Sequence, residues 1–163
     1  MHCGDTVYLG GRRHPAGEYD GFIYPARPKM MRPWALDDDV PGGFVPLLRS
    51  TLRSWAWARP EVDPHLLLGW IGAAFLGGAL AWRPMIYLTG GAGTGKSSLQ
   101  ALLRAILREW VFHTADTTRA GITQPIGLSS IAVSVDEMEG ESDPRRGIEI
   151  LKLARVASSG GRT

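Results

Sequence analysis

The stretch Gly90-Gly91-Ala92-Gly93-Thr94-Gly95-Lys96-Ser97 decides how this sequence is interpreted. It satisfies the pattern G-x-x-x-x-G-K-[ST], in which a glycine-rich loop between a strand and a helix wraps phosphate groups. The loop needs glycine because its backbone N–H groups must point inward at the phosphates, and side chains would block that approach. A chance match in a chain of this length has a probability on the order of 1% or less. The alternative, a glycine-rich turn with an adventitious lysine, is the weaker interpretation.

The residue types of this loop predict ATP and Mg²⁺ as its ligands. The helix expected to start near Lys96 directs the positive end of its dipole at the phosphates. Lys96 is expected to reach the β- and γ-phosphates and to act in catalysis, and the Ser97 hydroxyl is expected to bind Mg²⁺. The residues predicted to contact the nucleotide are Gly90, Gly91, Ala92, Gly93, Thr94, Gly95, Lys96, Ser97 and Ser98.

The sequence around the loop predicts an α/β fold. Met85–Thr89 is typical of a buried strand that enters the loop, and apolar residues at helical spacing follow the loop from Leu99 to Trp110. Strands and helices then alternate, with strands expected at 111–114 and 131–135 and helices at 117–126 and 143–157. This order predicts a parallel sheet flanked by helices, the architecture of a P-loop NTPase.

A second group of candidate residues, Asp136-Glu137, directly follows the expected strand Ile131–Val135. An acidic residue at the carboxyl end of a parallel strand emerges at the edge of the sheet where ligands bind. We expect Asp136 to hold Mg²⁺ through water, and Glu137 to act as the base that orients and deprotonates an attacking water. The alternative is a solvated acidic loop, and that is the favoured interpretation for Glu139, Glu141 and Asp143.

The chain before the core divides into three segments. Residues 1–24 are expected to form a small, mostly β segment, with strands at Thr6–Leu9 and Gly21–Tyr24. Residues 25–46 are rich in proline and glycine and are interpreted as a linker. Residues 47–82 are expected to form lead-in helices, and 83–163 a partial P-loop core.

The run Leu66–Trp82 contains no charged or strongly polar residue and approaches the length of a membrane span. Its glycines dilute the hydrophobicity, and a phosphate loop follows it directly, so a buried helix is favoured over a span. Gly69, Ala73 and Gly77 recur at four-residue spacing, which predicts a small-residue stripe that allows close helix packing.

The composition limits the class of protein. The chain has 163 residues, one cysteine and a net charge of +2. A single cysteine argues against a disulfide scaffold, and His2, Cys3 and His14 lack the spacing of a metal site. The start of the sequence lacks the pattern of a signal peptide, so we expect a cytoplasmic protein without a membrane partner.

Two further polar groups leave their roles open. One group follows an expected strand and consists of Asp116, Thr117, Thr118 and Arg119. Either one of these residues is expected to contact nucleotide or a neighbouring subunit, or Asp116 or Thr117 is expected to cap a helix, which is the favoured interpretation. The last helix carries positive charge that is either a solvated face or a contact with DNA or a subunit, at Arg145, Arg146, Lys152 and Arg155.

Several segments together resemble the ATPase half of phage- and prophage-type bifunctional DNA primase–helicases, which are similar to superfamily 3 and related AAA+ helicases. The resemblance covers roughly residues 60–163 and rests on Leu68-Gly69-Trp70-Ile71-Gly72, Trp82-Arg83-Pro84, the loop 88–97, Thr118-Arg119-Ala120-Gly121-Ile122, Val135-Asp136-Glu137 and Leu153-Ala154-Arg155-Val156-Ala157-Ser158-Ser159-Gly160-Gly161.

The resemblance implies a homo-oligomeric ring that hydrolyses ATP between subunits and unwinds DNA, in a bacterial cytoplasm. It assigns ATPase roles to Gly90, Gly95, Lys96, Ser97, Asp136 and Glu137. In family order a polar sensor, a DNA-contacting loop and an arginine finger come after the Asp-Glu pair, so we expect an incomplete motor core. Two alternatives stay open: an AAA+ ATPase that packages DNA or loads another motor, and an inactive nucleotide-binding remnant.

Overall fold

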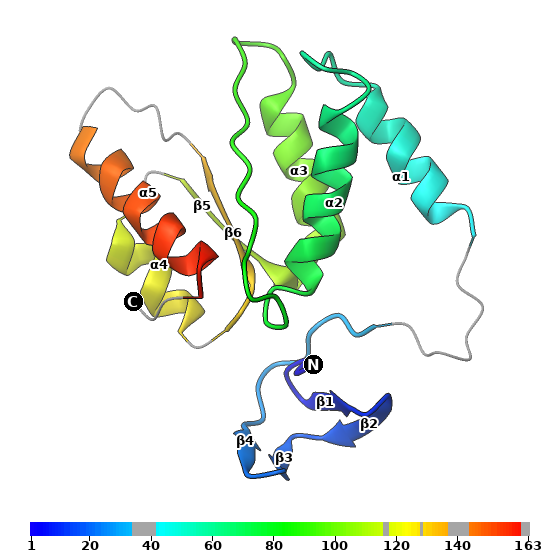
Figure 1. The fold of residues 1–163 in the computed structure, drawn as a ribbon, viewed down its shortest axis with the longest axis vertical. Coiled ribbons are helices and arrows are strands. Elements are labelled where there is room, and N and C mark those ends of the chain that lie inside the picture. The colour runs from blue at the N-terminus through cyan, green and yellow to red at the C-terminus, as the bar shows by residue number, and fades with distance from the viewer. Residues whose placement is uncertain (34–41, 116–117, 128, 137–143, 161–163) are drawn as a thin grey trace. The chain divides into compact units, whose positions relative to one another are not determined.

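The computed structural model describes residues 1–33, 42–115, 118–127, 129–136 and 144–160. By the contacts between residues, the chain divides into two compact units, Met1–Val40 and Pro41–Thr163. The fold is α/β, with two antiparallel pairs of strands in the first unit and one parallel pair in the second (Figure 1).

The first unit consists of two short hairpins. Strand β1 (Thr6–Leu9) pairs with β2 (Arg12–Pro15), and β3 (Gly17–Tyr19) pairs with β4 (Phe22–Tyr24). Gly10-Gly11 forms the turn between β1 and β2, Asp20-Gly21 forms the turn between β3 and β4, and all four residues have positive φ. Two-residue turns of this kind match the twist of the strands. The strand predicted at Thr6–Leu9 is confirmed, and the one predicted at Gly21–Tyr24 is confirmed from Phe22 onward, while β2 and β3 were not predicted.

The chain after β4 lies against the start of this unit. The N–H of Arg27 donates to the carbonyl oxygen of Gly4 at 3.2 Å. Arg32 Nη2 donates to both carboxylate oxygens of Asp5, at 2.9 and 2.8 Å. That hydrogen bond holds the pKa of Asp5 below its usual value. Burial raises the pKa of Cys3, which is fully enclosed in this unit.

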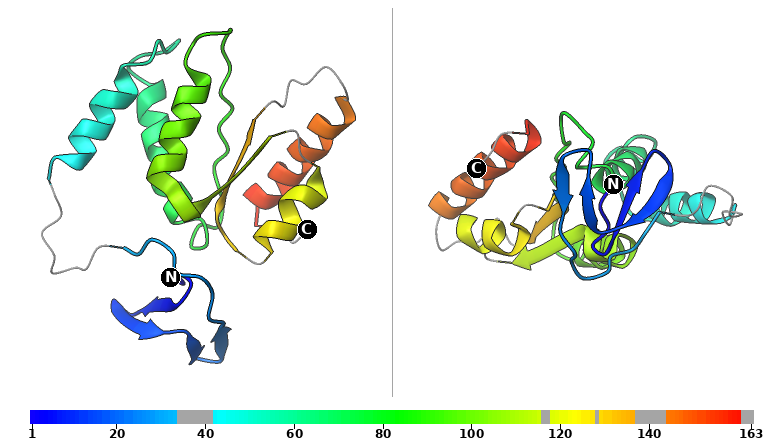
Figure 2. Two further views of the ribbon diagram at one scale, coloured as in Figure 1. Left: turned by 180° about the vertical axis from the view of Figure 1, so that it is seen from behind. Right: turned by 90° about the horizontal axis from the view of Figure 1, so that it is seen from below.

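The second unit is built around the parallel pair of β5 (Val111–Ala115) and β6 (Ala132–Asp136). Their register runs from Val111 opposite Ala132 to Ala115 opposite Asp136. Helices α1 (Phe44–Arg53), α2 (Asp63–Phe75) and α3 (Lys96–Leu107) lie on one side of the pair, and α4 (Arg119–Ile126) and α5 (Pro144–Ser158) lie on the other (Figures 1 and 2). The predicted alternation of helices and strands is confirmed from residue 96 onward.

A large part of the core of this unit lies between α3 and its neighbours α2 and β5. One face of α3 is buried through Leu99, Leu103 and Leu107, which recur every four residues. The helix contacts α2 and β5. A 3₁₀ turn, η1 (Arg108–Trp110), then leads into β5, and the Trp110 ring meets Phe75 of α2 edge-on, with centroids 6.1 Å apart. Burial of this face holds α3 against α2 and β5.

The strand predicted at Met85–Thr89 is wrong. In the part of the chain that the structure describes, this segment pairs with no strand, and the parallel sheet consists of β5 and β6. Its side chains alternate, with Met85 49% and Tyr87 61% exposed while Ile86 and Leu88 are half-buried. An extended apolar run becomes a strand only when a neighbour accepts its backbone hydrogen bonds, and the run itself does not specify that neighbour.

The helix expected over Leu66–Trp82 ends at Phe75, just before Gly77 and Gly78. No helix in the described ranges is both long enough and apolar enough to cross a bilayer. The predicted close-packing stripe is wrong at Gly69, where an added Cβ would meet nothing within 4 Å. At Gly77 a Cβ would lie 3.0 Å from the carbonyl oxygen of Ser130, so the close approach there is to a loop.

Candidate functional site

The glycine-rich loop turns sharply into α3. Gly93 and Gly95 have φ angles of +76° and +86°, in the left-handed region that favours glycine. Gly95 is the N-cap of α3, and Thr94 Oγ1 donates to the carbonyl oxygen of Gly91 at 2.9 Å. The motif therefore leads into the amino end of a long helix, as predicted, but an unpaired extended segment precedes it in place of the predicted strand.

The Lys96 ammonium group folds back onto the loop. Its Nζ donates to the carbonyl oxygen of Gly90 and, at 3.2 Å, to that of Gly91. Lys96, Ser97 and Ser98 are all exposed. The positive charge thus lies beside the backbone of the loop, within reach of any anion that the loop encloses.

The amino end of α3 provides donors for an anion. The first N–H groups of a helix have no partner within the helix. Within α3, whose residues are all described, no side chain caps this end and the first turn carries no acidic residue. The dipole of the helix and the free N–H groups both favour a bound phosphate here. By these criteria the loop and the first turn of α3 suit a phosphate group.

The second candidate residue, Asp136, belongs to β6. It is the last residue of the strand, half-buried, and in register with Ala115 at the end of β5. Both strands run parallel, so Asp136 lies at the carboxyl edge, as the sequence predicted. Glu137, Glu139, Glu141 and Asp143 lie outside the described residues.

The metal prediction concerns Ser97 and Asp136. Among the residues that the structure describes, no three His, Cys, Asp or Glu side chains gather as a metal site. Mg²⁺ commonly takes one or two protein oxygens and fills its remaining positions with water and phosphate oxygens. A hydroxyl and a carboxylate are therefore a suitable donor set for Mg²⁺.

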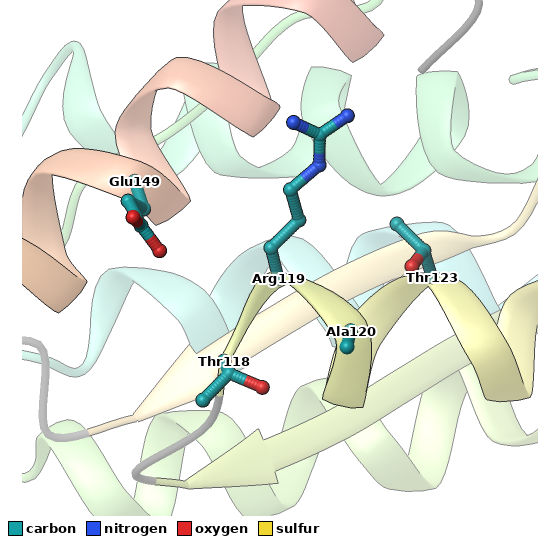
Figure 3. Close-up of a pocket in the computed structure, with 5 residues that line it drawn as sticks. All are labelled: Thr118, Arg119, Ala120, Thr123 and Glu149. Atoms are coloured by element: carbon teal, nitrogen blue, oxygen red, sulfur yellow. The ribbon is translucent and has the colours of Figure 1, made fainter.

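A shallow pocket of about 370 Å³ opens between α4 and α5, lined by Thr118, Arg119, Ala120, Thr123 and Glu149 (Figure 3). Thr118 is the N-cap of α4, and its Oγ1 accepts a hydrogen bond from the N–H of Gly121 at 3.2 Å. The capping role predicted for this region therefore belongs to Thr118; Asp116 and Thr117 lie outside the described residues. No sequence pattern indicated that Glu149 of α5 and Arg119 of α4 line the same pocket.

The positive residues of α5 are spread along the helix. Arg145, Lys152 and Arg155 are exposed, which agrees with a solvated face. The side chain of Arg146 is outside the described part. These positions do not gather with the glycine-rich loop in any contact of the described residues.

Two tryptophans hold the ends of the extended segment. Trp70 Nε1 donates to the carbonyl oxygen of Pro84, and Trp55 Nε1 donates to that of Gly95, both at 3.1 Å. Sequence reasoning missed these contacts, because each indole is far along the chain from the carbonyl group that it reaches. Their only sequence signal is a large side chain with an N–H donor close to the ends of the predicted helices.

Comparison with family models, with curated proteins and with solved structures gave no match in any of the three. The case for a nucleotide site therefore rests on the loop, α3 and β6 of this chain.

Proposed function

We propose that residues 90–98 bind the phosphates of ATP, and that Pro41–Thr163 belongs to a P-loop ATPase motor domain. The observation that carries the proposal is the join of the loop to α3. Two left-handed glycines, an uncapped first helical turn and the Lys96 ammonium group converge there. Oriented N–H groups and a lysine are what a triphosphate requires of its binding site.

In this proposal each residue has one task. The N–H groups of the loop donate to phosphate oxygens, and Lys96 exchanges the carbonyls of Gly90 and Gly91 for the β- and γ-phosphates. Ser97 and Asp136 hold Mg²⁺, which supplies charge neutralisation when it is bound.

Hydrolysis requires water at the γ-phosphorus. Glu137 accepts a proton as the oxygen of that water bonds to phosphorus, and the bond from phosphorus to the bridging oxygen of ADP breaks. Phosphoryl transfer depends mainly on positioning and on stabilisation of charge, so Lys96 and the loop contribute by holding the phosphates in place and offsetting their negative charge.

The wider role follows the resemblance. We propose that the chain is part of a replicative helicase of the phage-type primase–helicase kind, cytoplasmic, assembled as a ring and acting on DNA. What supports this assignment is the resemblance of the segments from residue 60 onward to that family.

Nucleotide binding by the full chain tests the proposal. Isothermal titration with Mg-ATP should give saturable binding, and Lys96→Ala should weaken it at least about tenfold, because hydrogen bonds to charged groups contribute about 1.5–3 kcal/mol. Lys152→Ala is the matched control, since Lys152 is an exposed lysine on α5. Equal affinity for Mg-ATP in wild type and Lys96→Ala would overturn the site.

A further inference from the structure

Trp55 follows α1 and is 40 residues away from the loop in sequence, yet it contacts the last residue of the loop. Its indole Nε1 donates to the carbonyl oxygen of Gly95 at 3.1 Å. The side chain is half-buried. The contact therefore joins the lead-in region directly to the N-cap residue of α3.

The carbonyl oxygen of Gly95 accepts two hydrogen bonds. One comes from Trp55, and the other comes from the N–H of Leu99 at 2.9 Å, which is the first hydrogen bond of α3. A carbonyl oxygen has two lone pairs, so both acceptor positions are filled. The two donors together fix the orientation of the peptide plane between Gly95 and Lys96.

That orientation determines where the N–H of Lys96 points. In a planar trans peptide the C=O and the N–H point in opposite directions. Holding the Gly95 carbonyl toward the helix and the indole therefore holds the Lys96 N–H toward the loop, where a phosphate would accept it. Trp55 acts on the donor through the peptide bond, without touching the ligand.

The indole also shapes the backbone at Gly95. A Cβ added to Gly95 would lie 2.8 Å from Trp55 Nε1, closer than carbon and nitrogen pack. The same residue has a φ of +86°. Glycine is required here twice, by its conformation and by the ring beside it, which indicates that the ring and the loop form one fitted unit.

We propose that Trp55 is a positioning residue of the phosphate-binding loop, which sets the Gly95–Lys96 peptide in its ligand-binding orientation and reports ligand binding through its fluorescence. This inference rests on the proposed ATP site. A donor held in place before the ligand arrives lowers the ordering cost of binding.

The chain offers a matched pair of variants. Trp55→Phe keeps an aromatic ring and removes the donor to Gly95. Trp57→Phe removes an equivalent donor, which bonds the carbonyl oxygen of Leu52 at 2.7 Å and does not reach the loop. Comparison of the two separates positioning of the loop from general support of the end of α1.

The test measures the Mg-ATP dissociation constant and the urea unfolding midpoint of the full chain in wild type and both variants. Trp55→Phe should raise the dissociation constant about two- to tenfold, the equivalent of one neutral hydrogen bond. Trp57→Phe should leave it unchanged, even if its unfolding midpoint falls as far. Tryptophan emission should respond to Mg-ATP in wild type and Trp57→Phe, and that response should be lost in Trp55→Phe.

The failures are distinguishable. If wild type binds Mg-ATP and Trp55→Phe binds it equally well, the role of Trp55 is overturned and the ATP site stands. An equal loss of affinity in Trp55→Phe and Trp57→Phe also overturns it, because the effect is then general. If wild type binds no Mg-ATP, the proposed function fails, and the inference fails with it.

Discussion

The two sides of the candidate site are built in different ways. On the acidic side, β5 and β6 pair through five residues each, and backbone hydrogen bonds place Asp136. On the loop side, the segment from Pro84 to Gly95, which includes the glycine-rich loop, pairs with no strand within the described ranges and is held at its two ends by indole donors. Strand pairing positions Asp136 through a series of equivalent backbone hydrogen bonds, whereas the position of the loop depends on a few individual side chains.

Arg83 adds to the support of the loop side at the start of the segment. Its Nε donates to the carbonyl oxygen of Gly77 at 2.7 Å, and its Nη1 to that of Ala157 at 3.2 Å. Its backbone N–H donates to the carbonyl oxygen of Ser158. Arg83 therefore links the end of α2 to the end of α5, and substitutions on the two sides should have different consequences.

The largest effect is expected at α3, which serves both sides. Leu107 is fully buried, so Leu107→Ala should lower the free energy of unfolding by about 2–5 kcal/mol, through lost transfer energy and a cavity. Urea unfolding followed by circular dichroism measures it. Leu66→Ala on the exposed face of α2 is the control and should change it by about 0.5 kcal/mol or less. Equal effects would mean that α3 is not the shared support.

Arg83→Leu should come next. It removes both side-chain hydrogen bonds while keeping the backbone one, and we expect a loss of about 1–3 kcal/mol in the free energy of unfolding. Arg49→Leu on the exposed face of α1 is the matched arginine control. A loss no larger than that of the control would show that the segment does not depend on Arg83.

Two glycine substitutions compare conformation with contact inside the loop. Gly93→Ala and Gly95→Ala both place a side chain at positive φ, at a cost of about 1–2 kcal/mol. Only at Gly95 does the new Cβ meet an indole, so Gly95→Ala should cost more and should also weaken Mg-ATP binding further. The excess should disappear when both variants are made in a Trp55→Ala background, as a double-mutant cycle measures. Equal costs in the original background would argue against the contact.

The smallest effect is expected on the strand side. Thr118→Ala removes the side-chain cap of α4 and should lower the free energy of unfolding by about 1 kcal/mol. Thr118→Ser keeps a hydroxyl that can cap the helix, so it should lower the free energy of unfolding much less. Because α4 and the helix α3 lie on opposite sides of the β5–β6 pair (Figure 1), neither variant should change the Mg-ATP dissociation constant. A change in that constant would mean that the pocket beside Thr118 takes part in nucleotide binding.

Local sequence patterns predicted the elements that local physics determines. The leucines of α3 repeat at helical spacing, and the β-branched run before Asp136 forms β6. The Asp20-Gly21 turn is a strong hairpin signal that identifies β3 as well as β4, so that strand was predictable. By contrast, β2 has the sequence Arg-Arg-His-Pro and becomes a strand only by pairing with β1.

The loop side was less predictable because its contacts are long-range. Nothing near Met85–Thr89 indicates whether a neighbouring strand is present, and nothing near Gly95 points to Trp55. The motif itself predicted the residues of the candidate site, since glycine at Gly93 and Gly95 follows from the local turn. The donors that hold that turn in place come from helices that the motif does not include.

One measurement tests the central claim most directly: the amide spectrum of the ¹⁵N-labelled full chain, recorded by NMR as Mg-ATP is added. The account predicts that the signals of residues 91–98 move with saturation, while those of Thr118 and Thr123 stay in place. Shifts confined to Thr118 and Thr123, or no shift within residues 91–98 at saturating Mg-ATP, would contradict it.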